Sequence, residues 1–342
     1  MSDSTEKSER TVLAGVLVAM LALIGLAAVV PDVQRLPAWG AESERGTGLV
    51  STSTIPTPGA DGTPVAPAAP TEPPEPAAPA TQALPRGATS IFGDGRFLVA
   101  YYGTAQTGAL GVLGETPPDV MQRRVERAAA PFARRHQPVQ PVYELIVTIA
   151  DRHAGKDGDF AHDIPRDQVQ KYIDAAHEHD ALLLLDIQPG RADFLDAAKR
   201  WAWALRDPYV GLALDPEWRM GRHGVPGTRI GSVDASEVNR VSGWLRDLVS
   251  DNALPQKLFV LHQFRTEMIN RIGSIEPRRG LVMVQHVDGF GTPGQKLDTF
   301  HTVARPGQFF MGFKLFYDED VPRMSPADVR QIDPRVRFVS FQ

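Results

Sequence analysis

Two carboxyl side chains, Asp215 and Glu217, stand at the end of a short apolar run, in the sequence Val-Gly-Leu-Ala-Leu-Asp-Pro-Glu-Trp. Side chains of a strand alternate between its two faces, so residues two apart point to the same side. Gly211 and Ala213 share that side and leave room beneath the acids. Pro216 has no N–H to donate, so regular strand pairing should stop there. Two acids held at a strand end are suited to general acid and base chemistry.

Polar side chains also gather at the ends of the other apolar runs. They are Tyr101, Tyr102, Asp151, Asp186, Gln188, His262, Gln263, Gln285, His286, Asp288, Lys314, Tyr317 and Asp318. A lone buried ammonium is costly, so we expect Lys314 to pair with Glu217 or Asp215. Structural roles are the alternative: aspartates cap loops and helices, and aromatic rings pack in cores.

From these positions we predict a candidate site without a metal or cofactor. The predicted catalytic residues are Glu217 and Asp215. The predicted substrate-binding residues are Tyr101, Asp186, Gln188, Trp218, His262, Gln285, Asp288, Lys314 and Tyr317. The glycine-rich segment from Arg219 to Val233 follows the two acids, and we interpret it as a lid or a substrate wall.

The elements that must position these residues repeat one rhythm, a short apolar run followed by a polar amphipathic segment. The expected strands are Phe97–Gly103, Val142–Asp151, Ala181–Gln188, Val210–Glu217, Leu258–Phe264, Leu281–Asp288, Phe309–Asp318 and Val336–Phe341. The seven segments between them can hold helices. Eight alternating units indicate an α/β fold, a (β/α)8 TIM barrel over residues 96–342, whose active site forms at the carboxyl ends of its strands.

Three local patterns support the helices. Apolar stripes at helical spacing are Val169, Tyr172, Ile173 and Ala176; Phe194, Ala198, Trp201 and Leu205; and Val238, Val241, Leu245 and Leu248. Asp234 with Glu237 resembles a capping box, and Ser325 before Pro326 is typical of a helix start. A doubly wound sheet is the alternative fold, disfavoured because no glycine-rich phosphate turn follows the first strand. The last strand has no helix after it, and residues 86–96 are candidates to cover that gap.

The N-terminal part has a different composition. Residues 11–30 are uncharged and almost wholly apolar, long enough to cross a bilayer as a transmembrane helix. A cleaved signal peptide is the alternative. We expect residues 1–10 in the cytoplasm and residues 31–95 as a disordered linker rich in Pro, Ala and Thr. The C-terminal domain would then be extracytoplasmic, held at the plasma membrane by a single pass.

Composition narrows the function. The 342-residue chain has a net charge of -5, which does not indicate a nucleic-acid partner. It has no cysteine, which excludes disulfides, thiolate metal sites, a cysteine nucleophile and a lipoprotein anchor.

The Asp-x-Glu motif of Asp215 and Glu217 resembles the signature of barrel glycosidases, in particular the chitinase-like and bacterial lysozyme-like families. The resemblance implies that Glu217 is the general acid and that Asp215 assists. The chain departs from the chitinase pattern at Gly211 and Ala213, where further aspartates are usual. It departs from the lysozyme-like pattern at Tyr101–Gly103, where an acid is usual. The domain, including Gly-Phe-Lys-Leu-Phe-Tyr-Asp, looks more like an uncharacterised group of surface-anchored actinobacterial proteins, which implies no activity.

The expectation is therefore a membrane-tethered, glycoside-hydrolase-like protein that acts on a cell-envelope or extracellular polysaccharide. Its partners would be this glycan and, through residues 11–30, the membrane. One alternative is a carbohydrate-binding or scaffolding barrel without catalysis. The other is a metal-dependent hydrolase that uses Asp186, Asp215, Glu217, His262 and His286, disfavoured because no tight metal-binding spacing is present.

Overall fold

The computed structural model describes residues 82–342, which form an eight-stranded parallel barrel closed by the pairing of its first two strands. The barrel strands are β1 (Phe97–Gly103), β2 (Val139–Ala150), β4 (Leu182–Ile187), β5 (Val210–Leu214), β7 (Lys257–Gln263), β9 (Leu281–Val287), β10 (Phe310–Leu315) and β11 (Val336–Phe341). They correspond to the eight predicted strands, in sequence order around the barrel. The TIM-like architecture is thus confirmed.

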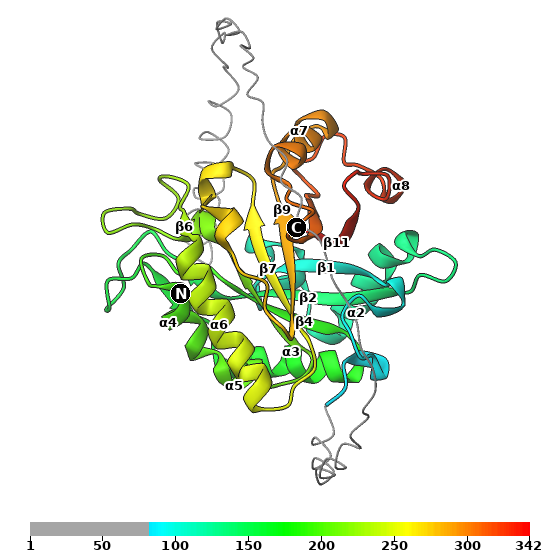
Figure 1. The fold of residues 1–342 in the computed structure, drawn as a ribbon, viewed down its shortest axis with the longest axis horizontal. Coiled ribbons are helices and arrows are strands. Elements are labelled where there is room, and N and C mark those ends of the chain that lie inside the picture. Colours follow the sequence, from blue (N-terminus) through cyan, green and yellow to red (C-terminus); the bar gives the residue numbers. More distant parts are fainter. Residues whose placement is uncertain (1–81) are drawn as a thin grey trace, which may run out of the picture.

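Helices lie around the outside of these strands (Figure 1). They are α2 (Pro118–Ala129), α3 (Arg166–Glu178), α4 (Phe194–Arg200), α5 (Ala202–Leu205), α6 (Ala235–Asp251), α7 (Pro293–Val303) and α8 (Pro326–Val329). Three short strands lie outside the barrel: β3 (Ala161–Asp163), antiparallel to β2, and the pair β6 (Val233–Asp234) and β8 (Ile269–Asn270). Among residues 82–342, no helix is long and apolar enough to span a membrane. The predicted span at residues 11–30 lies outside the described residues.

One of the seven predicted helical segments has a different structure. Between β7 and β9 the chain forms two 3-10 turns, Thr266–Met268 and Ile272–Ser274, and strand β8. Gly273, Pro277 and Gly280 interrupt this segment and leave no helical run of apolar residues. Pairing of β8 with β6 satisfies its backbone instead.

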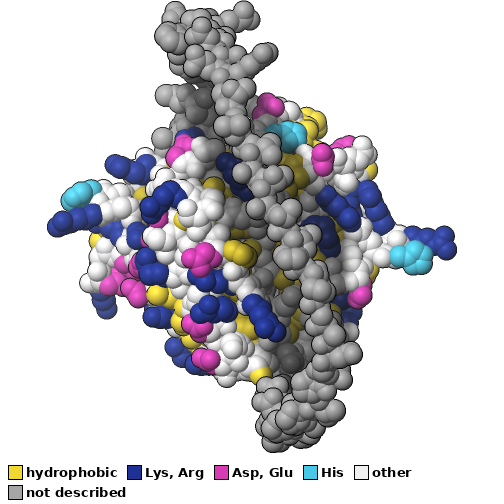
Figure 2. Space-filling view, in the orientation of Figure 1, with side chains coloured by type: hydrophobic (Ala, Val, Ile, Leu, Met, Phe, Trp, Pro, Cys, Tyr) yellow, Lys and Arg dark blue, Asp and Glu magenta, His cyan; other side chains and the backbone are white. Residues whose placement is uncertain are grey.

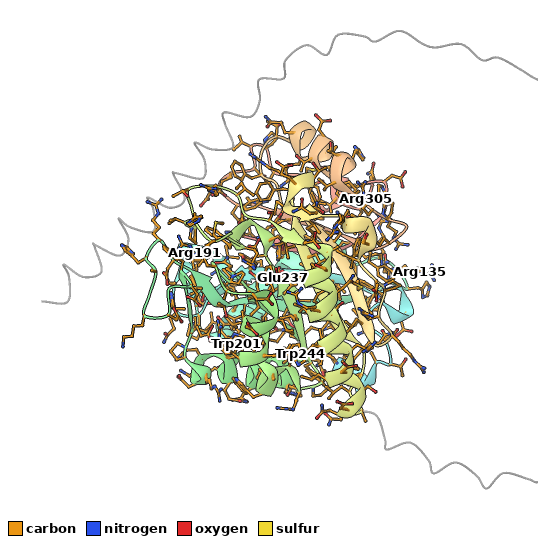
Figure 3. The ribbon with its side chains drawn as sticks, turned by 60° about the vertical axis from the view of Figure 1, so that its left-hand side comes forward. Arg135, Arg191, Trp201, Glu237, Trp244 and Arg305 are labelled. Atoms are coloured by element: carbon orange, nitrogen blue, oxygen red, sulfur yellow. The ribbon has the colours of Figure 1, made fainter. Side chains whose placement is uncertain are left out.

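The predicted stripes face the barrel, and the helix starts are confirmed with one change. Trp201 divides the second stripe into α4 and α5 and donates from Nε1 to Thr148 Oγ1 at 3.0 Å. Trp201 and Trp244 mark this helical layer in Figure 3. Ser325 caps α8 in a full capping box, but Asp234 caps α6 without help from Glu237, which is engaged elsewhere.

The barrel interior has an apolar floor. The lower halves of the strands contribute Leu98, Ala100, Val142, Leu182, Leu184, Ala213, Leu258, Val260, Val282, Val284 and Phe338. Leu84 and Ile91, each 2% exposed, pack into the same cluster from the segment before β1. This segment therefore closes the N-terminal mouth of the barrel.

Two expectations about this region need correction. Leu84 and Ile91 pack into the barrel, so the folded part of the described residues begins before the predicted start at residue 96. They also do not replace the missing eighth helix. Phe132, in the turn after α2, covers the outer side of β1 and β11, with ring centroids 5.2 Å from Phe97 and 6.2 Å from Phe341. The reason is that Leu84 and Ile91 are almost fully buried in the mouth, and burial of apolar area stabilises that position.

Charged side chains of both signs are interspersed over the face shown in Figure 2. A separate cluster of charged side chains and histidines is buried inside the barrel.

Candidate active site

Asp215 and Glu217 lie where β5 ends, but the strand is shorter than predicted. Regular pairing stops at Leu214, and Pro216–Trp218 forms a 3-10 turn because proline cannot continue the ladder. Asp215 is 2% exposed, whereas Glu217 is partly accessible to solvent. Glu217 is therefore the acid of this pair that a substrate can reach.

Below Glu217 the upper half of the barrel interior is polar and closed. His262 Nδ1 lies 2.9 Å from Asp288 Oδ2, and His262 Nε2 lies 3.1 Å from Glu144 Oε1 and 3.8 Å from Asp186 Oδ1. Tyr102 donates from its hydroxyl to Asp186 Oδ2 at 2.9 Å. These side chains are buried and come from five different strands or strand ends, so only closure of the barrel brings them together.

Lys314 belongs to this cluster, though not in the expected way. Its Nζ lies 3.4 Å from the centroid of the Tyr102 ring, and no ion pair of the described residues joins it to Asp215 or Glu217. A desolvated ammonium is attracted by the face of an aromatic ring, which explains this placement. Its charge still lowers the pKa values of Glu217 and Asp186 through space.

The structure brings most of the predicted residues together. Asp186, Gln188, His262, Asp288 and Lys314 line the upper interior with Asp215 and Glu217, and Gln188 Nε2 donates to the Tyr102 hydroxyl at 3.2 Å. Trp218 lies in the turn beside Glu217, partly buried.

Three predicted binding residues lie elsewhere. Tyr101 and Tyr317 are on the outer side of the barrel, joined by a 2.9 Å contact between their hydroxyls. Gln285 also faces outward and donates to Gln263 Oε1 and to the Val303 carbonyl. A shift of one residue along a strand reverses the face, so Tyr102 and His286 point inward where Tyr101 and Gln285 do not.

Sequence reasoning missed two interior residues, Glu144 and Ser340. Glu144 is the only charged residue in the apolar run of β2, and it lies two residues after the inward-facing Val142. A single charged residue at an inward-facing position of a strand predicts a polar group inside the barrel. Ser340, whose Oγ lies 2.7 Å from His286 Nε2, gave none, because serine occurs on either face of a strand.

The environments of the acids change their pKa values. Burial raises the pKa of Asp186 to about 6, against the opposing charge of His262. Burial, together with the charge of Glu217, raises the pKa of Asp215 well above its usual range. Burial and the nearby charge of Asp288 raise the pKa of Glu217 to about 8. Glu217 is therefore mainly protonated at neutral pH, and burial disfavours the ionised form of Asp215.

His262 responds in the opposite sense. Burial lowers its pKa, but the contacts with Asp288 and Glu144 outweigh burial and raise that pKa well above the usual value. Burial and the charge of His262 lower the pKa of His286 well below its usual value.

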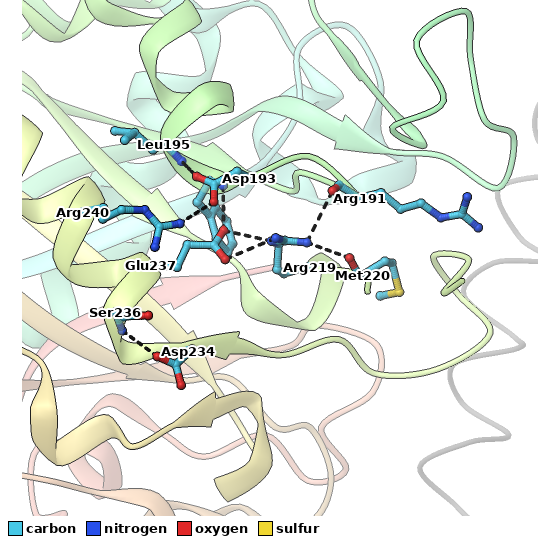
Figure 4. Close-up of polar contacts among 10 residues, drawn as sticks. Arg191, Asp193, Leu195, Arg219, Met220, Asp234, Ser236, Glu237 and Arg240 are labelled. Carbon is cyan, nitrogen blue, oxygen red and sulfur yellow. Dashed lines mark hydrogen bonds and ion pairs between the residues drawn. The ribbon is translucent and has the colours of Figure 1, made fainter. Parts of the chain in front are cut away.

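The loop after Glu217, predicted as a lid or wall, is fixed at its base. Arg219 Nε donates to Glu237 Oε1 at 2.9 Å and Arg219 Nη1 donates to the Met220 carbonyl at 2.7 Å (Figure 4). The same Glu237 oxygen accepts from the Phe194 N–H at 2.8 Å. Arg219 and Glu237 thus tie the turn that carries Glu217 to the starts of α4 and α6. Whether the rest of the loop closes over a substrate stays a prediction.

Gly231 at the base of this loop is expected to be intolerant of a side chain. A Cβ there would lie 2.5 Å from the Arg219 carbonyl oxygen and 2.7 Å from that of Glu217. Gly231→Ala must shift the turn, and we expect a loss of about 1–3 kcal/mol in the free energy of unfolding, as for overpacked sites. Denaturant unfolding measures it.

Gly221→Ala is the matched control, because a Cβ at Gly221 meets nothing within 4 Å. It should change stability by less than about 0.5 kcal/mol. Equal effects of the two substitutions would show that the contacts of Gly231 do not hold the turn.

A cavity with a volume of about 400 Å³ lies elsewhere and does not contain these acids. It lies on the outer side of β1 and β10 and is lined by Tyr101, Gly108, Ala109, Gly111, Val112, Glu115, Arg124, Tyr317, Asp318, Glu319 and Gln342. The polar interior is closed by comparison, and Glu217 is its accessible edge.

No family model matches the chain, and a search of curated proteins found no match.

Proposed function

We propose that this protein is a membrane-tethered, extracytoplasmic glycoside hydrolase that acts on a cell-envelope or extracellular polysaccharide, with Glu217 as the general acid. The observation that carries the proposal is the position of Glu217, partly accessible at a strand end of the barrel, with a pKa of about 8. A general acid must hold its proton at the working pH and reach the leaving group. Glu217 meets both requirements.

Glycosidic cleavage also needs an ionised carboxylate. Asp215, predicted as the partner of Glu217, is buried, and burial raises the pKa of its carboxyl well above the usual range, which disfavours a charged role. After burial, the charge of Asp288 is the strongest influence on Glu217. We therefore assign the ionised role to Asp288, at the end of β9, and keep Asp215 as an assisting donor.

In this scheme Glu217 donates its proton to the glycosidic oxygen as the bond to the anomeric carbon breaks. The Asp288 carboxylate, which is in contact with His262, stabilises through space the positive charge that develops on the sugar. Glu217, now ionised, takes a proton from the water molecule whose oxygen bonds to the anomeric carbon, which restores the acid and completes the hydrolysis. Lys314 and His262 limit the negative charge of the interior during these steps.

A panel of glycans tests the proposal. The full chain is incubated with peptidoglycan, arabinogalactan, and α- and β-glucans, and new reducing ends are measured beside direct binding. We expect release of reducing ends from at least one polymer. A panel that gives neither release nor binding would contradict the substrate class.

A second candidate function is a carbohydrate-binding barrel without catalysis. The closed interior favours it, because Asp186, Asp215 and Asp288 are almost inaccessible. Binding of a glycan without release of reducing ends, weakened by substitution of Glu217 or Trp218, would support this function over hydrolysis.

A further inference from the structure

Three buried side chains inside the barrel converge as metal ligands do. Glu144 on β2, His262 on β7 and His286 on β9 each offer one ligand atom, and these atoms lie within 4.8 Å of one another. All three side chains are 0% exposed. They come from separate strands, so their meeting point is set by the closed barrel rather than by local sequence.

Several polar atoms at this point have no hydrogen bond, although His262 Nε2 and Glu144 Oε1 face each other as an ion pair at 3.1 Å. Of the described residues, Glu144 leaves both carboxylate oxygens without a hydrogen bond, His262 leaves Nε2, and His286 leaves Nδ1. Asp186 Oδ1, 3.8 Å from His262 Nε2, is also without a hydrogen bond. Buried polar groups are almost always satisfied, so a concentration of unsatisfied donors and acceptors around one point indicates an additional bound group.

Each histidine is also held from behind. His262 Nδ1 lies 2.9 Å from Asp288 Oδ2, and His286 Nε2 lies 2.7 Å from Ser340 Oγ. Metal-binding histidines use one ring nitrogen for the metal and the other for such a contact, which fixes the ring. Gly312 allows the His286 ring to approach the backbone of β10 closely, because a Cβ there would lie 2.3 Å from Nδ1.

The charges of the interior favour a cation. Three buried carboxyl groups, from Glu144, Asp186 and Asp288, share the upper interior with the two imidazoles and one ammonium, Lys314. Burying uncompensated carboxylates is costly, and a divalent cation compensates two of them.

We propose that Glu144, His262 and His286 bind a divalent transition metal, zinc in the first instance, with Asp186 as a fourth ligand. Two imidazoles and a carboxylate match zinc, whereas Mg²⁺ and Ca²⁺ prefer oxygen ligands throughout. Bonds of about 2.0–2.2 Å place neighbouring ligand atoms about 3.3 Å apart in a tetrahedron, close to the 3.1 Å between His262 Nε2 and Glu144 Oε1. Zinc binds the neutral form of an imidazole, so binding at this site should be stronger at higher pH.

The test uses the full chain, produced in zinc-supplemented and in zinc-depleted medium, because the closed interior is best loaded during folding. Metal content is measured by mass spectrometry of the elements, and stability by thermal unfolding. We expect about one zinc per chain after supplementation and a higher Tm than in the depleted sample, since a ligand that binds only the folded state stabilises it. Cobalt, supplied in place of zinc, should give the visible absorption of a tetrahedral site with nitrogen and oxygen ligands.

Glu144→Gln and His286→Gln, which nearly conserve volume, should each lose the metal and the gain in Tm. The matched control is His179→Ala, which disrupts a second group of ligand atoms, from the surface residues Asp119, Glu178 and His179. Zinc retained by both interior variants, or lost in His179→Ala, would move the metal to the surface and overturn the proposal. A wild-type chain without stoichiometric zinc and without a change in Tm overturns it whether or not the variants fold.

The result is independent of glycan hydrolysis. Zinc binding without reducing-end release leaves this inference intact and contradicts the glycosidase alone. Release by a protein that binds no metal does the reverse.

Discussion

Glu217→Gln is expected to lower glycan turnover by about 10²–10⁴-fold, because the amide cannot donate the proton that the leaving group needs. The substitution keeps the size of the side chain in the turn Pro216–Trp218. Turnover is measured as initial rates of reducing-end release on the polymer that responds in the panel.

The control for this experiment is Glu267→Gln. Glu267 follows β7 at the same end of the barrel, and its side chain is exposed beside Arg265. The same substitution of glutamate by glutamine can therefore be made there. It should keep the wild-type rate. If Glu217→Gln also keeps that rate, Glu217 is not the general acid.

The pKa of Glu217 gives this assignment a signature in the pH profile. Because Glu217 must be protonated, kcat/KM should fall as the pH rises through about 8. Lys314→Met should move this limb to higher pH, since the ammonium lowers the pKa of Glu217. If the alkaline limb of the pH profile stays at the same pH, the charge of Lys314 does not influence the pKa of Glu217.

The same pKa predicts a stability effect that needs no substrate. The folded-state pKa of Glu217 is raised above its unfolded value of 4.5, so the folded protein binds more protons between these values. The contribution of Glu217 to the free energy of unfolding should therefore be fully present below about pH 4.5 and decline as the pH rises toward 8. Glu217→Gln should remove this part of the decline, as measured by denaturant unfolding at a series of pH values.

The second large effect is expected at the floor of the barrel. Leu84→Ala combined with Ile91→Ala should destabilise the fold by about 4–10 kcal/mol, because each truncation of a buried aliphatic side chain costs about 2–5 kcal/mol. Both side chains are 2% exposed inside the apolar cluster. Domains of this kind have about 5–15 kcal/mol of total stability, so the double variant should be close to unfolding.

Denaturant unfolding of the full chain measures this effect, with Val321→Ala as control. Val321 is 69% exposed, so its truncation should change stability by less than about 0.5 kcal/mol. A double variant as stable as the control would mean that residues 84–92 rest on the barrel without supporting it. The stable domain would then begin near residue 96, as predicted from the sequence.

The barrel and the end at which its polar groups collect could be predicted from the chain alone. Each of the eight apolar runs is local, and a buried parallel strand needs such a run whatever its neighbours are. The order of strands followed because short crossovers keep sequential parallel strands adjacent. The position of Asp215 and Glu217 after β5 followed from the same local pattern.

Closure of the barrel decided the rest. Tyr101 and Tyr102 are adjacent and equally polar, and only the register of β1 with β2 and β11 places Tyr102 inside. Likewise, Leu84 and Ile91 lie in a segment whose composition resembles a linker, and their burial depends on a mouth formed by strands far along the chain.

The polar centre depends most on tertiary structure. Glu144, His262 and His286 are separated by 118 and 24 residues, taken as 262 minus 144 and 286 minus 262. No spacing rule joins ligands at such separations. Their distances, their lack of hydrogen-bond partners and the raised pKa of Glu217 all arise from the desolvated interior, because electrostatic interactions there act between groups that the sequence does not place side by side.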